Sequence, residues 1–142
     1  MRREVLDQPK DQAAIEDECS ACHMPMSRVI AKQAGSGGQI FAHLPVGQAT
    51  SALAPLAADG VSCTVCHQIQ PDKFGTKASF NGGFVVAPAG PAEDRSVFGP
   101  FAIDRGLARV MHSSSRFAPA EGRHVQQSEL CASCHTLFTH AI

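Results

Sequence analysis

The chain has no Trp and no Tyr among its 142 residues, so its eight Phe supply all of its large aromatic side chains. Many of the other apolar residues are Ala, which removes little apolar surface from water when it is buried. A core built from Ala, Val and Phe is thin for a chain of this length. We therefore expect a group other than a side chain to supply part of the buried apolar bulk.

The sequence also lacks an excess of charge of either sign and a long apolar run. It has 12 Lys and Arg against 13 Asp and Glu, so no strongly basic face is implied and nucleic acid is not an expected partner. No stretch approaches the roughly 20 apolar residues that cross a bilayer, so no membrane span is expected. Residues 1–7 carry charge but lack the apolar segment of a secretory signal peptide.

Cysteine, by contrast, is present six times and always in the same pattern. Each pair is separated by two residues and followed at once by histidine, and no cysteine is left over. The three copies are Cys19 and Cys22 with His23, Cys63 and Cys66 with His67, and Cys131 and Cys134 with His135. Three copies of Cys-x-x-Cys-His in one chain are not accidental, and they are the most specific feature of the sequence.

Covalent haem is the chemistry that this pattern favours. Two thiols add across the two vinyl groups of one haem, and the adjacent histidine gives its imidazole to the iron as the proximal ligand. A zinc site is the first alternative, although adjacent Cys and His are awkward for one tetrahedral ion. Redox dithiols and a disulfide framework also use paired cysteines, but neither explains the repeated histidine. We predict three covalent c-type haems.

Four histidines remain after the proximal ligands, and three haems with two histidine ligands each need three of them. His43, His124 and His112 are the expected distal ligands, with His140 as a further candidate. The alternative for each is an ordinary core or surface histidine. Met24, Met26 and Met111 are other axial donors that haem iron accepts. Met24 and Met26 are too close to His23 to reach the opposite face of its haem, so they could ligate only another haem. We interpret them instead as residues that pack against porphyrin edges.

The expected fold is mainly α-helical with long irregular loops, packed around haem in a single domain over residues 1–142. Helices are expected over 11–22, 27–34 and 49–58, and Pro55 is expected to interrupt the helix over 49–58. A further helix is expected from Ser128 through the third motif to residues 137–141. Residues 71–100 are dense in Gly and Pro. There, 84–87 and 96–98 are expected to pair as a small β-hairpin, or else to form an irregular loop over haem edges.

The residues around the motifs resemble those of a known family. Residues 19–25, 59–67 and 128–135 look like the multihaem c-type cytochromes related to the tetrahaem cytochrome that accepts electrons from hydroxylamine oxidoreductase. The resemblance implies closely stacked haems, mostly with two histidine ligands, in a mainly helical fold. It also implies a periplasmic or cell-surface location in a bacterium. Relatives include electron carriers and reductases of nitrogen or sulfur oxyanions.

Two departures from this family bear on completeness. The chain has three motifs, and its first residues do not read as a signal peptide, although bacterial haem c is attached outside the cytoplasm. Its last motif also lies close to Ile142. The chain is therefore interpreted either as one three-haem domain or as a fragment of a longer multihaem protein.

The first functional hypothesis is electron transfer, with redox proteins, other multihaem cytochromes or further copies of the chain as partners. No catalytic residue is assigned. The alternative is a reductase, or a fragment of one, that acts on a small nitrogen or sulfur oxyanion at a haem with an open sixth position. A structural role in a larger cytochrome assembly is the third. The basic residues available to an anion or to haem propionates are Lys32, Lys73, Lys77, Arg105, Arg109 and Arg116.

Overall fold

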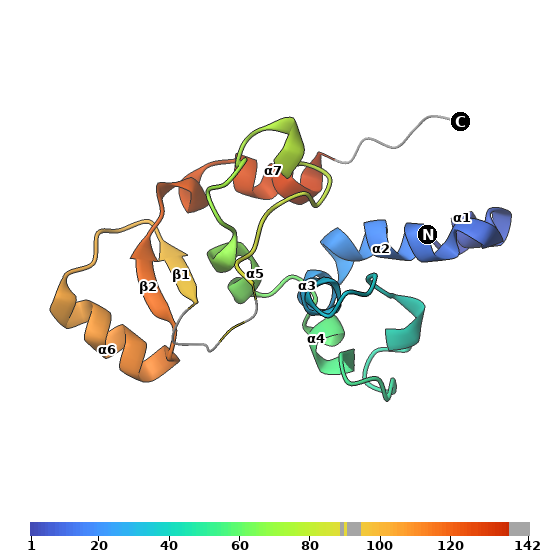
Figure 1. The fold of residues 1–142 in the computed structure, drawn as a ribbon, viewed down its shortest axis with the longest axis horizontal. Coiled ribbons are helices and arrows are strands. Elements are labelled where there is room, and N and C mark those ends of the chain that lie inside the picture. Colours follow the sequence, from blue (N-terminus) through green and yellow to red (C-terminus); the bar gives the residue numbers. More distant parts are fainter. Residues whose placement is uncertain (89, 91–94, 137–142) are drawn as a thin grey trace. The chain divides into compact units, whose positions relative to one another are not determined.

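The computed structural model describes residues 1–88, 90 and 95–136, and it is mostly helical with one small sheet (Figure 1). The α-helices are α1 (Arg2–Asp7), α2 (Gln12–His23), α3 (Pro25–Gln33), α4 (Ala54–Asp59), α5 (Cys63–Gln68), α6 (Arg105–Ser115) and α7 (Glu129–His135). The strands are β1 (Ser96–Gly99) and β2 (Ala118–Glu121). The expected mainly α-helical class is confirmed. Among the described residues, none of the helices has the length and apolar character needed to cross a membrane.

The chain divides into two compact units, Met1–Ser62 and Cys63–Ile142. The first unit carries the first Cys-x-x-Cys-His motif, and the second unit carries the other two. The single domain expected over residues 1–142 stays a prediction.

In the first unit, two of the expected helices are confirmed and one begins later than expected. The helices expected over 11–22 and 27–34 correspond to α2 and α3. Pro25 begins α3, because proline lacks the N–H that a continuous helix would need but is well suited to a first turn. The helix expected from residue 49 is wrong in its first part, since α4 begins at Ala54 with Pro55 in its first turn.

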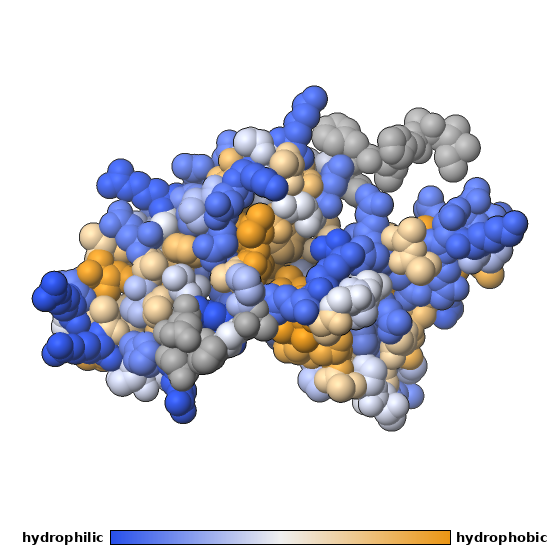
Figure 2. Space-filling view, viewed as in Figure 1, coloured by the Kyte–Doolittle hydropathy of each residue, from blue (hydrophilic) through white to orange (hydrophobic). Residues whose placement is uncertain are grey.

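The apolar core is as small as the composition predicts. In the first unit Met24, Ile40 and Ala57 form a buried cluster, and Cys19 packs against it. Large apolar side chains also stay exposed, among them Leu6, Val46, Phe101 and Val110. Figure 2 shows apolar residues lying between hydrophilic ones on the visible face. The chain by itself therefore leaves apolar surface in contact with water.

In the second unit, β1 pairs with β2 in parallel, from Ser96 opposite Ala118 to Gly99 opposite Glu121. The expected hairpin between 84–87 and 96–98 is therefore wrong. Val86 forms an isolated antiparallel bridge with Ile69 instead. The physical reason is α6, which lies between β1 and β2 in the sequence and makes the crossover that parallel strands require.

The helix expected from Ser128 through the third motif is present as α7. It begins at Glu129, directly after Ser128, and it ends at His135. The continuation expected over residues 137–141 lies outside the described residues. The helix therefore contains the whole third motif.

Helix α6 begins at a side-chain cap that anchors it. The Asp104 carboxylate accepts hydrogen bonds from the backbone N–H groups of Gly106 and Leu107, at 2.7 and 2.9 Å. Replacing Asp104 with alanine removes both, and we expect the opening free energy of α6 to fall by about 1 kcal/mol. Hydrogen exchange at the α6 amides measures this change. Asp104→Ser keeps a capping oxygen and is the control; equal protection in the alanine variant and the parent would contradict the prediction.

Candidate functional site

All three cysteine motifs lie on helices. The first forms the end of α2, the second forms most of α5, and the third forms the end of α7. At 3.6 residues per turn, the two cysteines of each motif lie roughly one turn apart on similar sides of the helix. This spacing presents the two sulfurs of a motif to one group beside the helix.

The six cysteines lie within the described residues, and none of them is in a disulfide. The disulfide alternative therefore finds no support in the structure. The exposed cysteines are Cys63 and Cys131, and the half-buried ones are Cys19, Cys22, Cys66 and Cys134. Each motif thus has thiols that are at least partly accessible. The haem-attachment role of all six, including the pair Cys131 and Cys134 on α7, stays a prediction.

The second and third motifs come close together in the second unit. Burial raises the pKa of the Cys66 thiol, and the neighbouring thiols of Cys131 and Cys63 raise it further. Cys131 is 65 positions from Cys66 in the sequence, so tertiary structure brings them within electrostatic reach. Burial likewise raises the pKa of Cys19 in the first unit. Within the part of the chain that the structure describes, no cluster of three or more metal-ligating side chains occurs, so the zinc alternative finds no site there.

His67, the proximal histidine of the second motif, is oriented by a strand. Its Nδ1 atom donates a hydrogen bond to the backbone carbonyl oxygen of Phe98 in β1, at 2.5 Å. A histidine that ligates a metal through one ring nitrogen commonly donates the other N–H to a carbonyl. The bond therefore leaves Nε2 of His67 available to a metal. His23 and His135 occupy the equivalent final positions of α2 and α7, and both are exposed.

His43 is the spare histidine whose setting best fits a ligand. It is 5% exposed, at the end of a short 3-10 turn, Phe41–His43. Its Nδ1 atom lies 2.7 Å from the Ser51 hydroxyl oxygen, and this contact leaves Nε2 as the atom for a metal.

His124 is also buried, but its ring nitrogens are used differently. Its Nε2 atom donates to the carbonyl oxygen of Ile69 at 2.8 Å, and the rings of Phe74 and Phe98 meet it edge-on. Only Nδ1 is left for a metal in this position. The distal role expected of His124 stays a prediction, and it requires either that atom or a rotated ring.

The remaining axial candidates lie in different surroundings. His112 is exposed on α6, and His140 lies outside the described residues. Met24 packs in the core cluster of the first unit, whereas Met111 is 40% exposed. Packing of Met24 against haem stays a prediction.

Arg95 is a basic residue that sequence reasoning missed. Its guanidinium lies over the Phe117 ring, 5.3 Å from the ring centre. Its Nε atom is buried and has no hydrogen-bond partner among the described residues. A buried donor without an acceptor is costly, and a carboxylate such as a haem propionate would satisfy it. Lys32, which the sequence offers for the same role, is engaged by Asp17 at 2.8 Å.

A cavity in the first unit lies beside the turn that carries His43. Its volume is about 630 Å³, within the range of about 300–1,000 Å³ that is usual for ligand pockets. The lining is mostly apolar with one cation, from Arg2, Val5, Leu6, Gln12, Phe41, Leu44, Pro45 and Val46. The partly accessible thiols, the oriented imidazole of His67 and the unsatisfied Arg95 donor fit the chemistry of covalent haem. Among the described residues, no cysteine or histidine lines the cavity.

A scan against protein-family models found no match to this chain, and neither a search of curated proteins nor a search of solved structures returned one.

Proposed function

We propose that the chain is an electron-transfer protein that carries three covalent c-type haems, one at each Cys-x-x-Cys-His motif. The repeated motif is the single observation that carries this proposal. The placement of every motif on a helix, with thiols outside any disulfide, supports it. When bound, each haem supplies a one-electron iron couple, which the polypeptide itself lacks.

The chain's own residues have separable roles in this proposal. The motif histidines offer proximal imidazoles, and the Phe98 carbonyl holds the His67 ring in one orientation through its 2.5 Å hydrogen bond. His43 is the distal ligand that its setting supports best, and two histidine ligands favour a lower potential than histidine with methionine. The nearness of Cys66 and Cys131 supports close spacing of the second and third haems. The haem-attaching residues are Cys19, Cys22, Cys63, Cys66, Cys131 and Cys134, and the proximal ligands are His23, His67 and His135.

The proposal also covers location and partners. Covalent haem attachment in bacteria takes place outside the cytoplasm, so a periplasmic or cell-surface location goes with it. Redox proteins, including other multihaem cytochromes or further copies of this chain, are the proposed partners. The resemblance of the motif segments to the multihaem cytochrome family is the basis for this proposed location and for these partners.

A reductase is the second candidate, and the settings of His124 and His112 are the observation behind it. Of the spare histidines within the described residues, His43 is buried with Nε2 available, whereas His124 uses Nε2 and His112 is exposed. A haem without a sixth protein ligand is open to a small oxyanion. Arg95 is positively charged, and its Nε has no partner among the described residues, so it can donate a hydrogen bond to such an anion.

Haem content and carbon monoxide binding test the two functions together. The full chain, produced in a bacterium that attaches haem c and targeted to its periplasm, is expected to contain three covalent haems by mass spectrometry. An electron carrier in which every iron has two protein ligands is low-spin and leaves carbon monoxide unbound after reduction. One carbon monoxide-binding haem per chain would select the reductase. A chain without covalent haem would overturn both.

A further inference from the structure

We propose that Glu16 is a positioning residue that holds His43 in place as a haem-iron ligand. The inference rests on the proposed function, which it deepens by adding a residue outside the motifs. Glu16 lies on α2, three residues before Cys19, and is only 7% exposed. It thus belongs to the same helix as the first haem-attachment motif.

The Glu16 carboxylate accepts hydrogen bonds from the start of the turn that carries His43. One oxygen, Oε2, accepts from the backbone N–H groups of Ile40 and Phe41, at 2.6 and 2.9 Å. The other, Oε1, accepts from the Gln12 side chain at 2.7 Å. Backbone N–H groups at the start of a helical turn have no partner within the turn, so Glu16 supplies the missing acceptor.

The hydrogen bonds to Glu16 also lower the pKa of its carboxyl group. Burial by itself would raise the pKa of Glu16, but the hydrogen bonds from Gln12, Ile40 and Phe41 outweigh it, and the pKa lies below its usual value.

His43 is therefore held from two sides. Glu16 anchors the backbone at the start of the turn, and Ser51 contacts the ring at Nδ1. Because α2 also carries the first haem-attachment motif, this carboxylate ties the position of His43 to that motif. The two contacts fix the orientation of the His43 ring, so that Nε2 is already placed to bind a metal. Hydrogen-bond partners of metal ligands commonly have this role.

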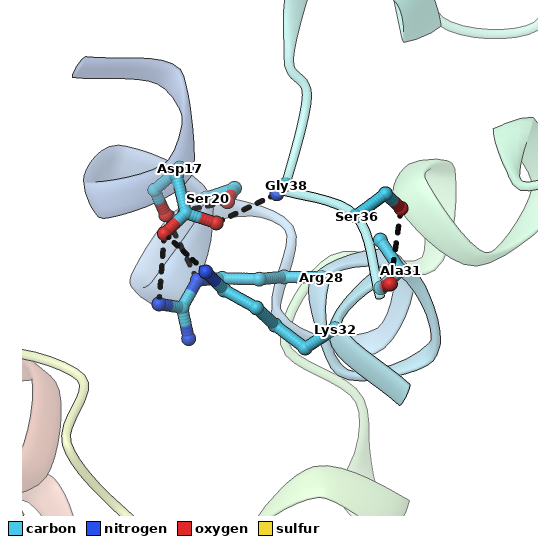
Figure 3. A network of polar contacts seen from close by, with 7 residues as sticks. All are labelled: Asp17, Ser20, Arg28, Ala31, Lys32, Ser36 and Gly38. Carbon is cyan, nitrogen blue, oxygen red and sulfur yellow. Dashed lines mark hydrogen bonds and ion pairs between the residues drawn. The ribbon is translucent and has the colours of Figure 1, made fainter. Parts of the chain in front are cut away.

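The next residue, Asp17, provides a matched comparison. Its carboxylate accepts a hydrogen bond from the Gly38 N–H at 2.7 Å and lies near Arg28 and Lys32 (Figure 3). Asp17 thus anchors an earlier part of the same loop, whereas Glu16 bonds the turn itself. Removing Asp17 weakens the loop without removing the acceptor of the N–H groups that begin the turn.

The test compares variants of the haem-loaded full chain by electron paramagnetic resonance and by carbon monoxide binding. Glu16→Ala is expected to convert one haem per chain from low-spin to high-spin and to add one carbon monoxide-binding haem. His43→Ala is expected to produce the same change. Glu16→Gln keeps an acceptor oxygen for both N–H groups and is expected to stay low-spin, and Asp17→Ala is expected to do the same.

The outcomes separate this inference from the proposed function. A Glu16→Ala chain with parental spin states would overturn it, as would a His43→Ala chain that stays low-spin while retaining three haems. In both cases covalent haem binding still stands. A parent chain without covalent haem overturns the proposed function instead. If Glu16→Ala fails to fold, His43→Ala and Glu16→Gln decide together. A high-spin haem in His43→Ala with a low-spin Gln variant supports the inference, whereas a low-spin His43→Ala or a high-spin Gln variant contradicts it.

Discussion

The double variant Cys63→Ala/Cys66→Ala is expected to contain two covalent haems per chain instead of three. The variant cannot form either thioether bond at the second motif. The first and third motifs keep both of their cysteines and their histidine, so each can still attach its own haem. A covalent haem also buries apolar surface that this chain otherwise leaves open, so we expect the second unit to lose stability as well. Intact-protein mass and the haem absorbance per chain measure the loss.

Thr64→Ser is the matched control for this double variant. Thr64 lies between the two cysteines, and a serine there leaves both thiols and His67 in place. The control is expected to keep all three haems. A double variant with three covalent haems would show that the second motif does not attach haem. A double variant with none would show that attachment at the other motifs depends on it.

Replacing Gly122 with alanine is expected to destabilise the second unit by about 1–3 kcal/mol, because the added methyl group has no space. An alanine Cβ would lie 2.6 Å from Cε1 of His124 and 2.8 Å from Cδ1 of Phe98. The backbone at Gly122 has φ -147° and ψ 98°, which any residue adopts, so the cost is steric. Since the Phe98 carbonyl bonds His67, the same change should disturb that imidazole.

Gly99→Ala is the control for this effect. Gly99 belongs to β1, and its carbonyl oxygen accepts the N–H of Gly122, yet nothing lies within 4 Å of an added Cβ. Denaturant unfolding of the haem-loaded chain measures the stability, and the low-spin haem spectrum reports on His67. Equal unfolding midpoints for the two variants would show that the space around Gly122 is not limiting.

Much of the local structure could be predicted because local signals decide it. Ile15, Cys19 and Cys22 recur at helical spacing, and they lie on α2 as expected. Pro25 and Gly35 mark the limits of α3 for reasons that involve one residue each. Ser128 precedes α7 as expected, although its side chain makes no capping bond to the helix.

The sheet could not be predicted in this way. Each strand is only four residues long, so neither carries a distinct period. Their pairing depends on α6, which connects them. Gly106 and the serines at the end of α6 have low helix propensity, so the sequence gives only a weak signal for this helix, and the Asp104 cap helps to stabilise it. The sequence-based prediction paired residues 96–98 with the nearby segment 84–87. In the structure, β1 pairs instead with β2, which follows α6.

The residues that orient the candidate ligands were missed for a similar reason. Phe98 acts through its backbone carbonyl, so its side chain gives no sign of that role. Glu16 is an ordinary helical glutamate until the loop of residues 36–41 folds over it. Arg95 becomes notable only because its Nε is buried without a partner among the described residues.

The sequence by itself determined the three Cys-x-x-Cys-His motifs, on which the proposed haem attachment and proximal ligation depend. Haem attachment depends on two cysteines and a histidine within five consecutive residues, a spacing that any helix preserves. Tertiary structure decided which histidine nitrogens stay available. The bonds that decide it join His67 to Phe98 and His124 to Ile69, across 31 and 55 positions. Such long-range contacts depend on how the whole unit packs, and no short pattern in the sequence encodes them.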